Sequence, residues 1–294
     1  MQLLSGSVLD RLAGRIEQCS GYLEFGLGQG DENGEQVFRL TSARFCRVRQ
    51  CPICQWRKAL MWRARFYKAF PAIERDFPKA RYIFLTLTVK NCPISDLRET
   101  IRWMNDSWKR LTNRQTWPAL GFIRTTEVTR GKDGTAHPHF HCLLMVQPSY
   151  FQGKYYLSHA KWTELWQSCL QVDYTPIVEV HAVKPRADRG KARAGDQQQA
   201  IADTVMEVFK YAVKPEQMLG DGTEVDRAWL IDLASSLHKR RSVVLGGVFR
   251  QYMSESEPED LIGEEGGELD SDLRLWFGWR EMVSRYVKVD TPKS

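Results

Sequence analysis

Apolar side chains recur along the chain with two distinct periods, one typical of β-strands and one of α-helices. Residues 82–91 (YIFLTLTVKN) alternate between two faces, which predicts a strand with Phe84, Thr86 and Thr88 on one of them. Residues 176–184 (PIVEVHAVK) alternate in the same way and predict a second strand. The chain therefore contains sheet-forming segments whose two faces differ in polarity.

Four other segments show the spacing of amphipathic helices, with apolar residues three and four positions apart. They are residues 55–70, which carry a basic face, and residues 95–112, 159–171 and 200–217. We expect Ser95 to be the N-cap of the second helix. The core-facing stripe of that helix consists of Leu97, Ile101, Met104, Trp108 and Leu111.

Residues 121–146 predict a β-hairpin that turns at GKDG, and its second strand holds half of the six histidines of the chain. His137, His139 and His141 occupy alternate positions, so they share one face of that strand. Pro138 cannot donate a ladder hydrogen bond, and we expect regular pairing to begin near His139. Two imidazoles at positions i and i+2 of a strand are a natural half of a metal site.

The hairpin also brings a carboxylate toward the histidines. If Arg130 pairs near Thr135 or Ala136, Glu127 lies opposite Pro138 or His139, and the second register places it on the face of the imidazoles. Two histidines and one carboxylate leave coordination positions open for a phosphate oxygen, which suits Mg²⁺ or Mn²⁺. The alternatives are histidines that simply fill the core or form hydrogen bonds, and a Glu127 that pairs with a Lys or Arg.

Cysteine spacing predicts a second metal site. Cys46, Cys51 and Cys54 form a C-x4-C-x2-C cluster, and Cys19 is the nearest cysteine upstream. Four thiolates are a typical ligand set for structural Zn²⁺. A redox-active C-x-x-C pair is the alternative, which the additional cysteine at position 46 disfavours.

The charge distribution favours a polyanionic partner. Residues 254–272 carry nine acidic and no basic residues, whereas the first 253 residues hold 37 Lys or Arg and 25 Asp or Glu. A body this basic indicates nucleic acid as the simplest partner. No apolar stretch reaches the roughly 18 residues of a membrane-spanning helix. The N-terminus does not resemble a signal peptide, so we expect a cytoplasmic protein without a membrane partner.

One face of the helix expected over 200–217 carries three groups that can act on a phosphate: Glu207, Tyr211 and Lys214, at spacings of four and three. A tyrosine near a metal-bound phosphate can attack the phosphorus, and Lys214 or the metal would favour its phenolate. Glu207 could then act as a general base on water. Taken alone, the same pattern also fits a solvated Glu–Lys surface.

Three segments taken in order, FLTLT, HPHFHCLLMV and EVFKYAVKP, resemble the three motifs of HUH endonucleases. The chain is most similar to the initiator (Rep) proteins of plasmids that replicate by the rolling-circle mechanism. The cysteine cluster and residues 237–250 (LHKRRSVVLGGVFR) also resemble that group. The resemblance implies an α+β fold, in which a central antiparallel sheet of about five strands carries the histidine motif and a small zinc-binding region precedes it.

The resemblance also implies roles for individual residues. His139 and His141 would bind the metal with Glu127 as third ligand, and His137 would support or replace one of them. Tyr211 would nick single-stranded or hairpin origin DNA, leaving a 5′-phosphotyrosine and a free 3′-hydroxyl. Lys214 would assist Tyr211, and Glu207 would activate the water that ends a replication round. Host helicase or polymerase are further expected partners.

The motifs suggest a division of the chain into four parts. We expect a cysteine-rich zinc-binding region with a basic helix over 1–75, an endonuclease domain over 76–252, an acidic linker over 253–272 and a C-terminal aromatic and basic helix over 273–294. His181, on the strand 176–184, is expected to be structural or to contact DNA. Competing functions are an HUH transposase or relaxase, a non-catalytic zinc-containing DNA-binding regulator, and a zinc hydrolase of small substrates.

Overall fold

The computed structural model describes residues 10–28, 37–184, 196–209, 224–253, 269–283 and 285–290. These residues belong to two compact units. The smaller unit takes residues from Met1–Met61 and Ser256–Ser294, and the larger one takes residues from Trp62–Glu255. Along the chain, the boundary between them falls inside helix α2 (Pro52–Asp76).

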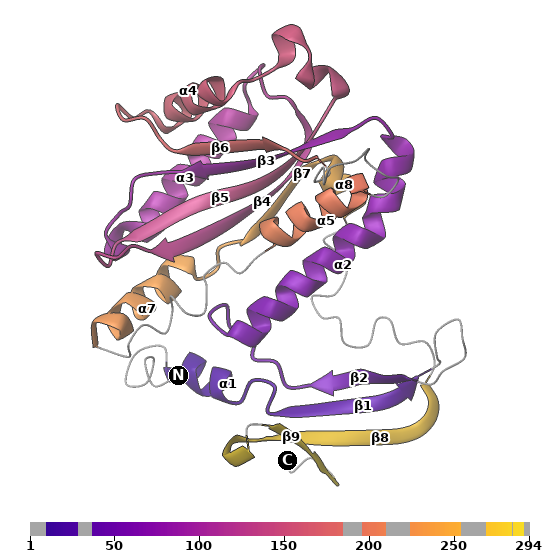
Figure 1. The fold of residues 1–294 in the computed structure, drawn as a ribbon. Coiled ribbons are helices and arrows are strands. Elements are labelled where there is room, and N and C mark those ends of the chain that lie inside the picture. Colours follow the sequence, from indigo (N-terminus) through magenta and orange to yellow (C-terminus); the bar gives the residue numbers. More distant parts are fainter. Residues whose placement is uncertain are drawn as a thin grey trace. The chain divides into compact units, whose positions relative to one another are not determined.

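The larger unit is built on a five-stranded antiparallel sheet with the order β6-β3-β5-β4-β7 (Figure 1). Its strands are β3 (Arg81–Thr88), β4 (Ala119–Arg130), β5 (Ala136–Val146), β6 (Val178–Ala182) and β7 (Val243–Gly247). The expected α+β fold is confirmed, and the histidine-bearing strand β5 is the central strand of the sheet.

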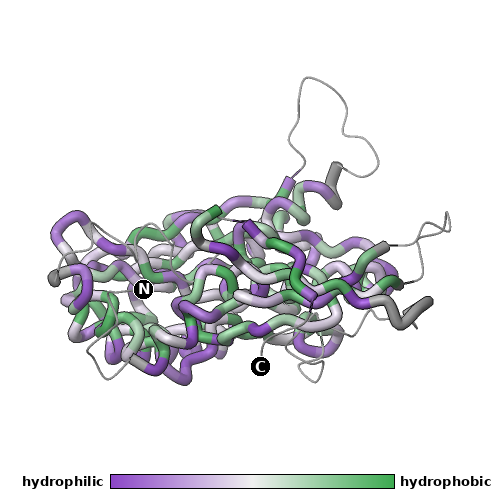
Figure 2. The backbone as a smooth tube through the Cα atoms, turned by 90° about the horizontal axis from the view of Figure 1, so that it is seen from below, coloured by the Kyte–Doolittle hydropathy of each residue, from purple (hydrophilic) through white to green (hydrophobic). Residues whose placement is uncertain are grey.

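Helices cover both faces of this sheet (Figure 1). On one face, α3 (Leu97–Thr112) and α4 (His159–Leu170) pack against the apolar side chains that β3 and β5 present there. On the other face, α2, α5 (Asp196–Val208) and the short α8 (Val248–Tyr252) pack against a second apolar cluster, which includes Ile123, Leu143 and Met145. Green and purple stretches alternate along most described elements, as expected for strands and helices with one covered face (Figure 2).

The hairpin of β4 and β5 has the second of the two registers considered from the sequence. Arg130 pairs with Ala136, and Glu127 lies directly opposite His139. The turn is closed by hydrogen bonds from Gly131 N to Thr135 O (2.8 Å) and from Gly134 N to Gly131 O (3.0 Å). The expected start of pairing near His139 holds for β3, whose last pair is Thr88–His139, but it is wrong for β4, which pairs with β5 through Pro138 to Ala136.

The predicted stripe of α3 is buried, but its N-terminus differs from the expectation. A short 3₁₀ helix, η2 (Ile94–Asp96), precedes α3, and the N-cap is Asp96 without a side-chain cap. Ser95 lies within η2 and its hydroxyl donates to Asp96 instead, at 3.0 Å. The prediction of Ser95 as N-cap is therefore wrong, because the chain enters the helix through a tighter turn.

Two short 3₁₀ turns and helix α7 complete the helical elements described in the larger unit. The 3₁₀ turns η3 (Pro148–Phe151) and η4 (Gly153–Tyr155) lead from β5 to α4. Helix α7 (Glu224–Leu237) is joined to the end of β4 by an ion pair between Arg130 and Asp226, and the Arg130 guanidinium lies 5.2 Å from the centre of the Trp229 ring. These two contacts hold α7 at the hairpin end of β4.

The smaller unit contains a four-stranded antiparallel sheet with the order β2-β1-β8-β9. Helix α1 (Asp10–Glu17) precedes β1 (Tyr22–Gly28) and β2 (Val37–Ala43). The other two strands are β8 (Leu269–Arg280) and β9 (Arg285–Val289), joined through η5 (Glu281–Val283). The expected C-terminal helix over 273–294 is therefore wrong. Its Leu275, Phe277 and Trp279 lie at every second position, which is the period of a strand rather than of a helix.

Within the described ranges, no helix combines the length and the apolar character needed to cross a membrane. The expected acidic linker over 253–272 falls mostly outside these ranges, as do Tyr211 and Lys214.

The turn from β7 into α8 predicts a strong dependence on one glycine. Gly247 has a φ of 55°, and a Cβ there would lie 2.0 Å from the Leu120 carbonyl oxygen. Replacing Gly247 by Ala should lower the free energy of unfolding by more than about 2 kcal/mol, as measured by urea denaturation.

A matched control is Gly134→Ala, because Gly134 also has a positive φ of 80° but open space around the added Cβ. It should cost only the backbone term, about 1 kcal/mol. Equal effects of the two substitutions would contradict a steric role for Gly247.

Candidate functional site

The face of the sheet that packs against α2, α5 and α8 changes character along β5. Leu143 and Met145 are buried in the apolar cluster of that face. His141 and His139, the next residues on the same side toward the hairpin, lie beside Thr86 and Thr88 of β3. The sheet thus carries an apolar core at one end of this face and a polar group at the other.

Three potential ligand atoms converge at the polar end. Glu127, His139 and His141 each offer one atom, and these atoms all lie within 4.8 Å of one another. Glu127 Oε2 lies 3.0 Å from His141 Nε2 and 3.5 Å from His139 Nε2. This is the triad that the hairpin register predicts.

The second nitrogen of each ring fixes the direction in which the ring points. His139 Nδ1 lies 3.1 Å from the His137 carbonyl oxygen, which can only accept, so Nδ1 carries a proton and Nε2 is the nitrogen left to face Glu127 or a metal ion. His141 Nδ1 lies 3.3 Å from the Thr86 hydroxyl, and its ring stacks on Phe84 with centroids 5.6 Å apart. Both Nε2 atoms are therefore presented to Glu127 and to any ion held there.

The electrostatics of Glu127 suit a cation ligand. Burial alone would raise the pKa of this carboxyl, but hydrogen bonds and charge interactions with His139 and His141 outweigh burial and lower the pKa to about 2. Glu127 is only 6% exposed and remains ionised at neutral pH. Two imidazole nitrogens and one carboxylate oxygen on one side of a site could hold a divalent metal and leave its other positions open.

His137 lies on the same face but is directed elsewhere. Its Nδ1 is 2.8 Å from Asn91 Oδ1, in the segment that follows β3. Burial, and secondly the neighbouring His139, lower the pKa of His137. His137 is not among the three residues whose ligand atoms converge, although its carbonyl oxygen orients His139.

Helix α5 is attached to the sheet beside the triad. The Thr125 hydroxyl donates to the Val208 carbonyl oxygen at 2.8 Å, and Thr125 pairs with His141 in the sheet. Val205 and Val208 are buried, whereas Glu207 is half-buried on the same helix. Tyr211 lies three residues beyond Val208, outside the described residues.

The lone histidine of β6 stands apart from the triad. His181 is exposed and pairs with Phe84, whereas the His139 partner on β3 is Thr88. It belongs to neither group of potential metal ligands within the described residues.

The smaller unit brings four cysteines together, as the sequence predicts. Cys19 follows α1, Cys46 and Cys51 flank a loop after β2, and Cys54 lies in the first turn of α2. The Sγ–Sγ distances are 3.5 Å for Cys19–Cys54, 3.5 Å for Cys46–Cys54 and 3.4 Å for Cys19–Cys51. Pro52 begins α2, where its missing N–H costs no helical hydrogen bond.

Backbone amides point at these thiols. Arg47 N lies 3.2 Å from Cys54 Sγ, and Val48 N lies 3.5 Å from Cys46 Sγ. Hydrogen bonds from Cys46 and Cys51 lower the pKa of Cys54, whereas the hydrogen bond with Cys51 raises the pKa of Cys46. These hydrogen bonds favour ionisation of Cys54 and oppose that of Cys46, and a bound cation would allow all four to be thiolates.

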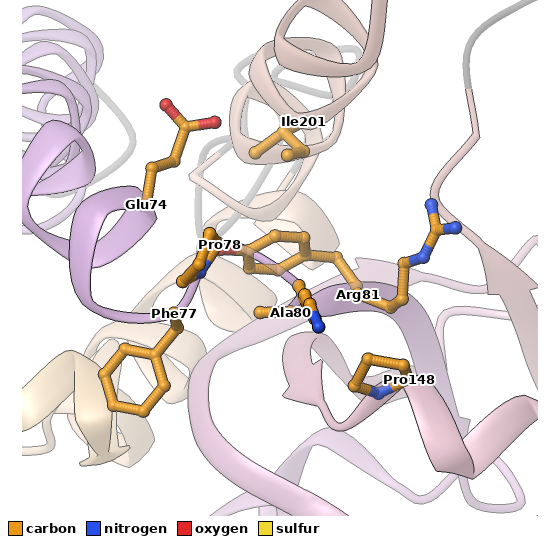
Figure 3. Close-up of a pocket in the computed structure, with 9 residues that line it drawn as sticks. Glu74, Phe77, Pro78, Ala80, Arg81, Pro148 and Ile201 are labelled. Carbon is orange, nitrogen blue, oxygen red and sulfur yellow. The ribbon is translucent and has the colours of Figure 1, made fainter.

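A pocket of about 440 Å³ lies elsewhere in the larger unit (Figure 3). Glu74 of α2, Ile201 of α5 and Pro148 of η3 surround it, and Arg81 lies at the start of β3. The triad lies near Thr88, at the other end of that strand, roughly 20 Å away at about 3.3 Å per residue. We assign no chemistry to this pocket.

The supporting residues Thr86, Asn91 and Thr125 could not be identified as such from the sequence. The β3–β5 register that brings Thr86 to His141 joins strands separated by α3 and β4, so no short turn fixes it. The alternating threonines of β3 were the available signal. They predict the face of β3 on which Thr86 lies, but not that His141 is its partner.

The replication protein family matches the chain over residues 37–287. The chain belongs to this family. This membership confirms the similarity to plasmid replication initiators seen in the three motifs. The matched range includes the triad and three of the four clustered cysteines.

Several replication proteins are similar over most of their length. Protein rep of Lentilactobacillus hilgardii is 31% identical over 278 residues, which cover 93% of this chain and 84% of that protein. Protein rep of Bacillus amyloliquefaciens is 33% identical over 291 residues, covering 94% and 84%. Protein rep of Lactiplantibacillus plantarum is 34% identical over 241 residues, covering 80% and 73%. No solved structure matches the chain.

The orientation of His141 by Thr86 predicts an effect on metal affinity. Replacing Thr86 by Val keeps the shape of the side chain but leaves His141 Nδ1 without this partner. We expect binding of Mn²⁺, titrated by electron paramagnetic resonance, to weaken roughly tenfold.

Thr88→Val is the matched control, because Thr88 lies on the same strand and face but donates to the Ile177 carbonyl oxygen at 2.9 Å. Its Mn²⁺ affinity should stay within about twofold of the wild type. A loss of affinity in both variants would mean that sheet stability, rather than ring orientation, controls the site.

Proposed function

We propose that this replication protein initiates rolling-circle replication of a plasmid by nicking single-stranded or hairpin origin DNA with Tyr211. The observation that carries the proposal is the convergence of Glu127, His139 and His141 on the central strand, next to the point where α5 is attached to the sheet. Val208 is held at Thr125, the partner of His141, and three residues span at most roughly 11 Å. The length of this segment is thus compatible with a Tyr211 that acts at the triad, which supports the proposal.

In the proposed reaction, the Tyr211 phenolate oxygen attacks the scissile phosphorus. A bond forms between this oxygen and phosphorus, and the bond from phosphorus to the 3′-oxygen breaks. The 3′-oxygen takes up a proton and becomes the free 3′-hydroxyl, while the 5′-phosphate stays on Tyr211. The unperturbed pKa of a tyrosine is about 10, so the phenolate needs a nearby cation, for which Lys214 is the proposed residue.

The triad would hold Mg²⁺ or Mn²⁺ during this step. The fit rests on the Nε2 atoms of His139 and His141 and on the ionised carboxylate of Glu127, whose ligand atoms all lie within 4.8 Å of one another. A bound divalent ion would supply electrostatic stabilisation of charge on the phosphate oxygens. His137 contributes by orienting His139 through its carbonyl oxygen, rather than as a ligand.

The four cysteines would hold a structural Zn²⁺. Tetrahedral coordination with Zn–S bonds of about 2.3 Å requires sulfur atoms about 3.8 Å apart. The sulfur distances of 3.4 and 3.5 Å lie close to this value, and the amides directed at Cys46 and Cys54 suit thiolates. The proposed role of this ion is to organise the smaller unit.

Glu207 is proposed to end the replication round. It precedes Tyr211 by four residues and is half-buried, so it can accept a proton from a water that attacks the phosphotyrosine phosphorus. Hydrolysis then releases Tyr211 and a 5′-phosphate. Host helicase and polymerase remain expected partners, because the free 3′-hydroxyl is a primer. We expect the protein to act in the cytoplasm, where plasmid DNA is located.

The alternative is an HUH nuclease of the transposase or relaxase type, which would use the same triad and tyrosine. A non-catalytic DNA-binding regulator would have no use for a metal triad with open coordination positions.

The first test is a gel assay for a covalent protein–DNA adduct with labelled single-stranded origin oligonucleotides and Mn²⁺. Tyr211→Phe removes the attacking oxygen, so adduct formation should fall by more than about 10³-fold, and chelation should have the same effect. Strand cleavage that persists in Tyr211→Phe would identify water or another residue as the nucleophile.

A second test concerns Glu207. In Glu207→Gln, the first nick should proceed within about threefold of the wild-type rate, while hydrolysis of the adduct should slow by about 10²-fold. The measurement is the decay of purified adduct in a chase without free DNA. Unchanged decay would exclude Glu207 as the base.

A further inference from the structure

The cysteine cluster carries a strongly basic outer surface that its proposed structural role does not require. Residues 44–58 contain five Lys or Arg and no Asp or Glu. Arg44 and Arg47 are exposed and Arg57 is half-buried. Two of these arginines are close to the cluster: Arg47 N contacts Cys54 Sγ at 3.2 Å, and Arg57 lies 3.7 Å over the Phe45 ring, next to Cys46.

Arg47 has a backbone conformation that disfavours its own side chain. Its φ is 55°, in the left-handed region where an L side chain costs free energy and glycine does not. The hydrogen bond to Cys54 Sγ requires only the backbone N–H of this residue. Glycine would make the same bond with less strain, so the bond to Cys54 Sγ does not itself require an arginine at this position.

An exposed indole directly precedes Arg57 in the sequence. Trp56 follows Cys54 by two residues in the first turns of α2 and is 50% exposed, and Ile53 on the same helical face is 37% exposed. An exposed tryptophan among arginines is typical of surfaces that bind nucleic acid, where guanidinium groups contact phosphates and the ring stacks on an unpaired base.

We propose that this surface, the arginine knuckle formed by Arg44, Arg47, Trp56 and Arg57, binds DNA that has both phosphates and unpaired bases. It is a contact of the smaller unit, additional to the triad of the larger unit. The inference rests on the proposed function, because that function makes DNA the substrate. The partner it favours is the loop of a DNA hairpin rather than a continuous duplex.

The arginines could instead only offset the negative charge of four thiolates and their metal. The two explanations differ in what Arg47→Gly does. If the side chain only offsets charge, the variant should lose zinc. If it contacts DNA, the variant should keep its zinc and unfold at the same or a higher temperature, because the backbone strain is relieved. Only its DNA affinity should then fall.

The chain provides a matched control in Lys239. This residue also has a φ of 55°, is exposed, and lies in the larger unit. Lys239→Gly therefore makes the same backbone change and removes one positive charge, but away from the knuckle in the sequence and in another unit.

The experiment measures equilibrium binding of the zinc-loaded full chain to a fluorescent DNA hairpin with an unpaired loop, over a salt series without Mg²⁺ or Mn²⁺. We expect Arg47→Gly to bind about tenfold more weakly and to reduce the salt dependence by roughly one counterion, with zinc content unchanged. Lys239→Gly should stay within about twofold of the wild type. Equal affinities of the two variants would overturn the proposal.

Trp56→Ala tests the base contact. It should weaken binding of the looped hairpin roughly tenfold and leave binding of a fully paired duplex of the same stem unchanged. Equal losses on both probes would contradict stacking on an unpaired base. If Arg47→Gly loses zinc, the hairpin affinity of Arg44→Gln is measured in its place. An affinity of Arg44→Gln equal to that of the wild type would also overturn the proposal.

The outcomes separate the knuckle from the nicking chemistry. A wild-type protein that binds the hairpin but forms no covalent adduct contradicts the proposed function, whereas the comparison of Arg47→Gly with Lys239→Gly still stands. Normal adduct formation with equal affinities of the two variants contradicts the knuckle alone.

Discussion

The register of the β4–β5 hairpin is the constraint on which the rest of the larger unit depends. Side chains alternate between faces, so a slip of one residue would move Glu127 to the opposite face from His139 and His141. The same slip would exchange the apolar residues that pack against α3 and α4 with those that pack against α2 and α5. Core packing and metal-site geometry therefore select the same register, and the short turn after Arg130 secures it.

A buried carboxylate beside two imidazoles is costly unless the three groups satisfy one another. Glu127 and His139 are both less than a tenth exposed, and the hydrogen bonds among them compensate for the loss of water. The outer nitrogens are satisfied by the His137 carbonyl oxygen and the Thr86 hydroxyl. The triad is thus preorganised by the sheet, which reduces the rearrangement needed when an ion binds.

Much of this arrangement follows from local patterns. The alternation of β3, the stripe of α3 and the short loop of the hairpin each fix geometry within a few residues, and they predict the face of the histidines and the partner Glu127. The prediction of a helix over 273–294 fails because aromatic residues suit both a strand and a packed helix, whereas the alternation of Leu275, Phe277 and Trp279 is that of a strand. Contacts between distant segments, such as Thr86 with His141 and Thr125 with Val208, depend on tertiary packing. The spacing of residues within one segment cannot predict them.

The sheet of the smaller unit has a consequence for the order of events during synthesis. Strand β1 pairs with β8, which lies about 240 residues later in the chain. All strands of the larger sheet lie between these two, so a ribosome delivers them before β8. The histidine-bearing sheet can therefore fold while the chain is still growing, whereas the sheet that accompanies the cysteine cluster closes only when translation is nearly complete.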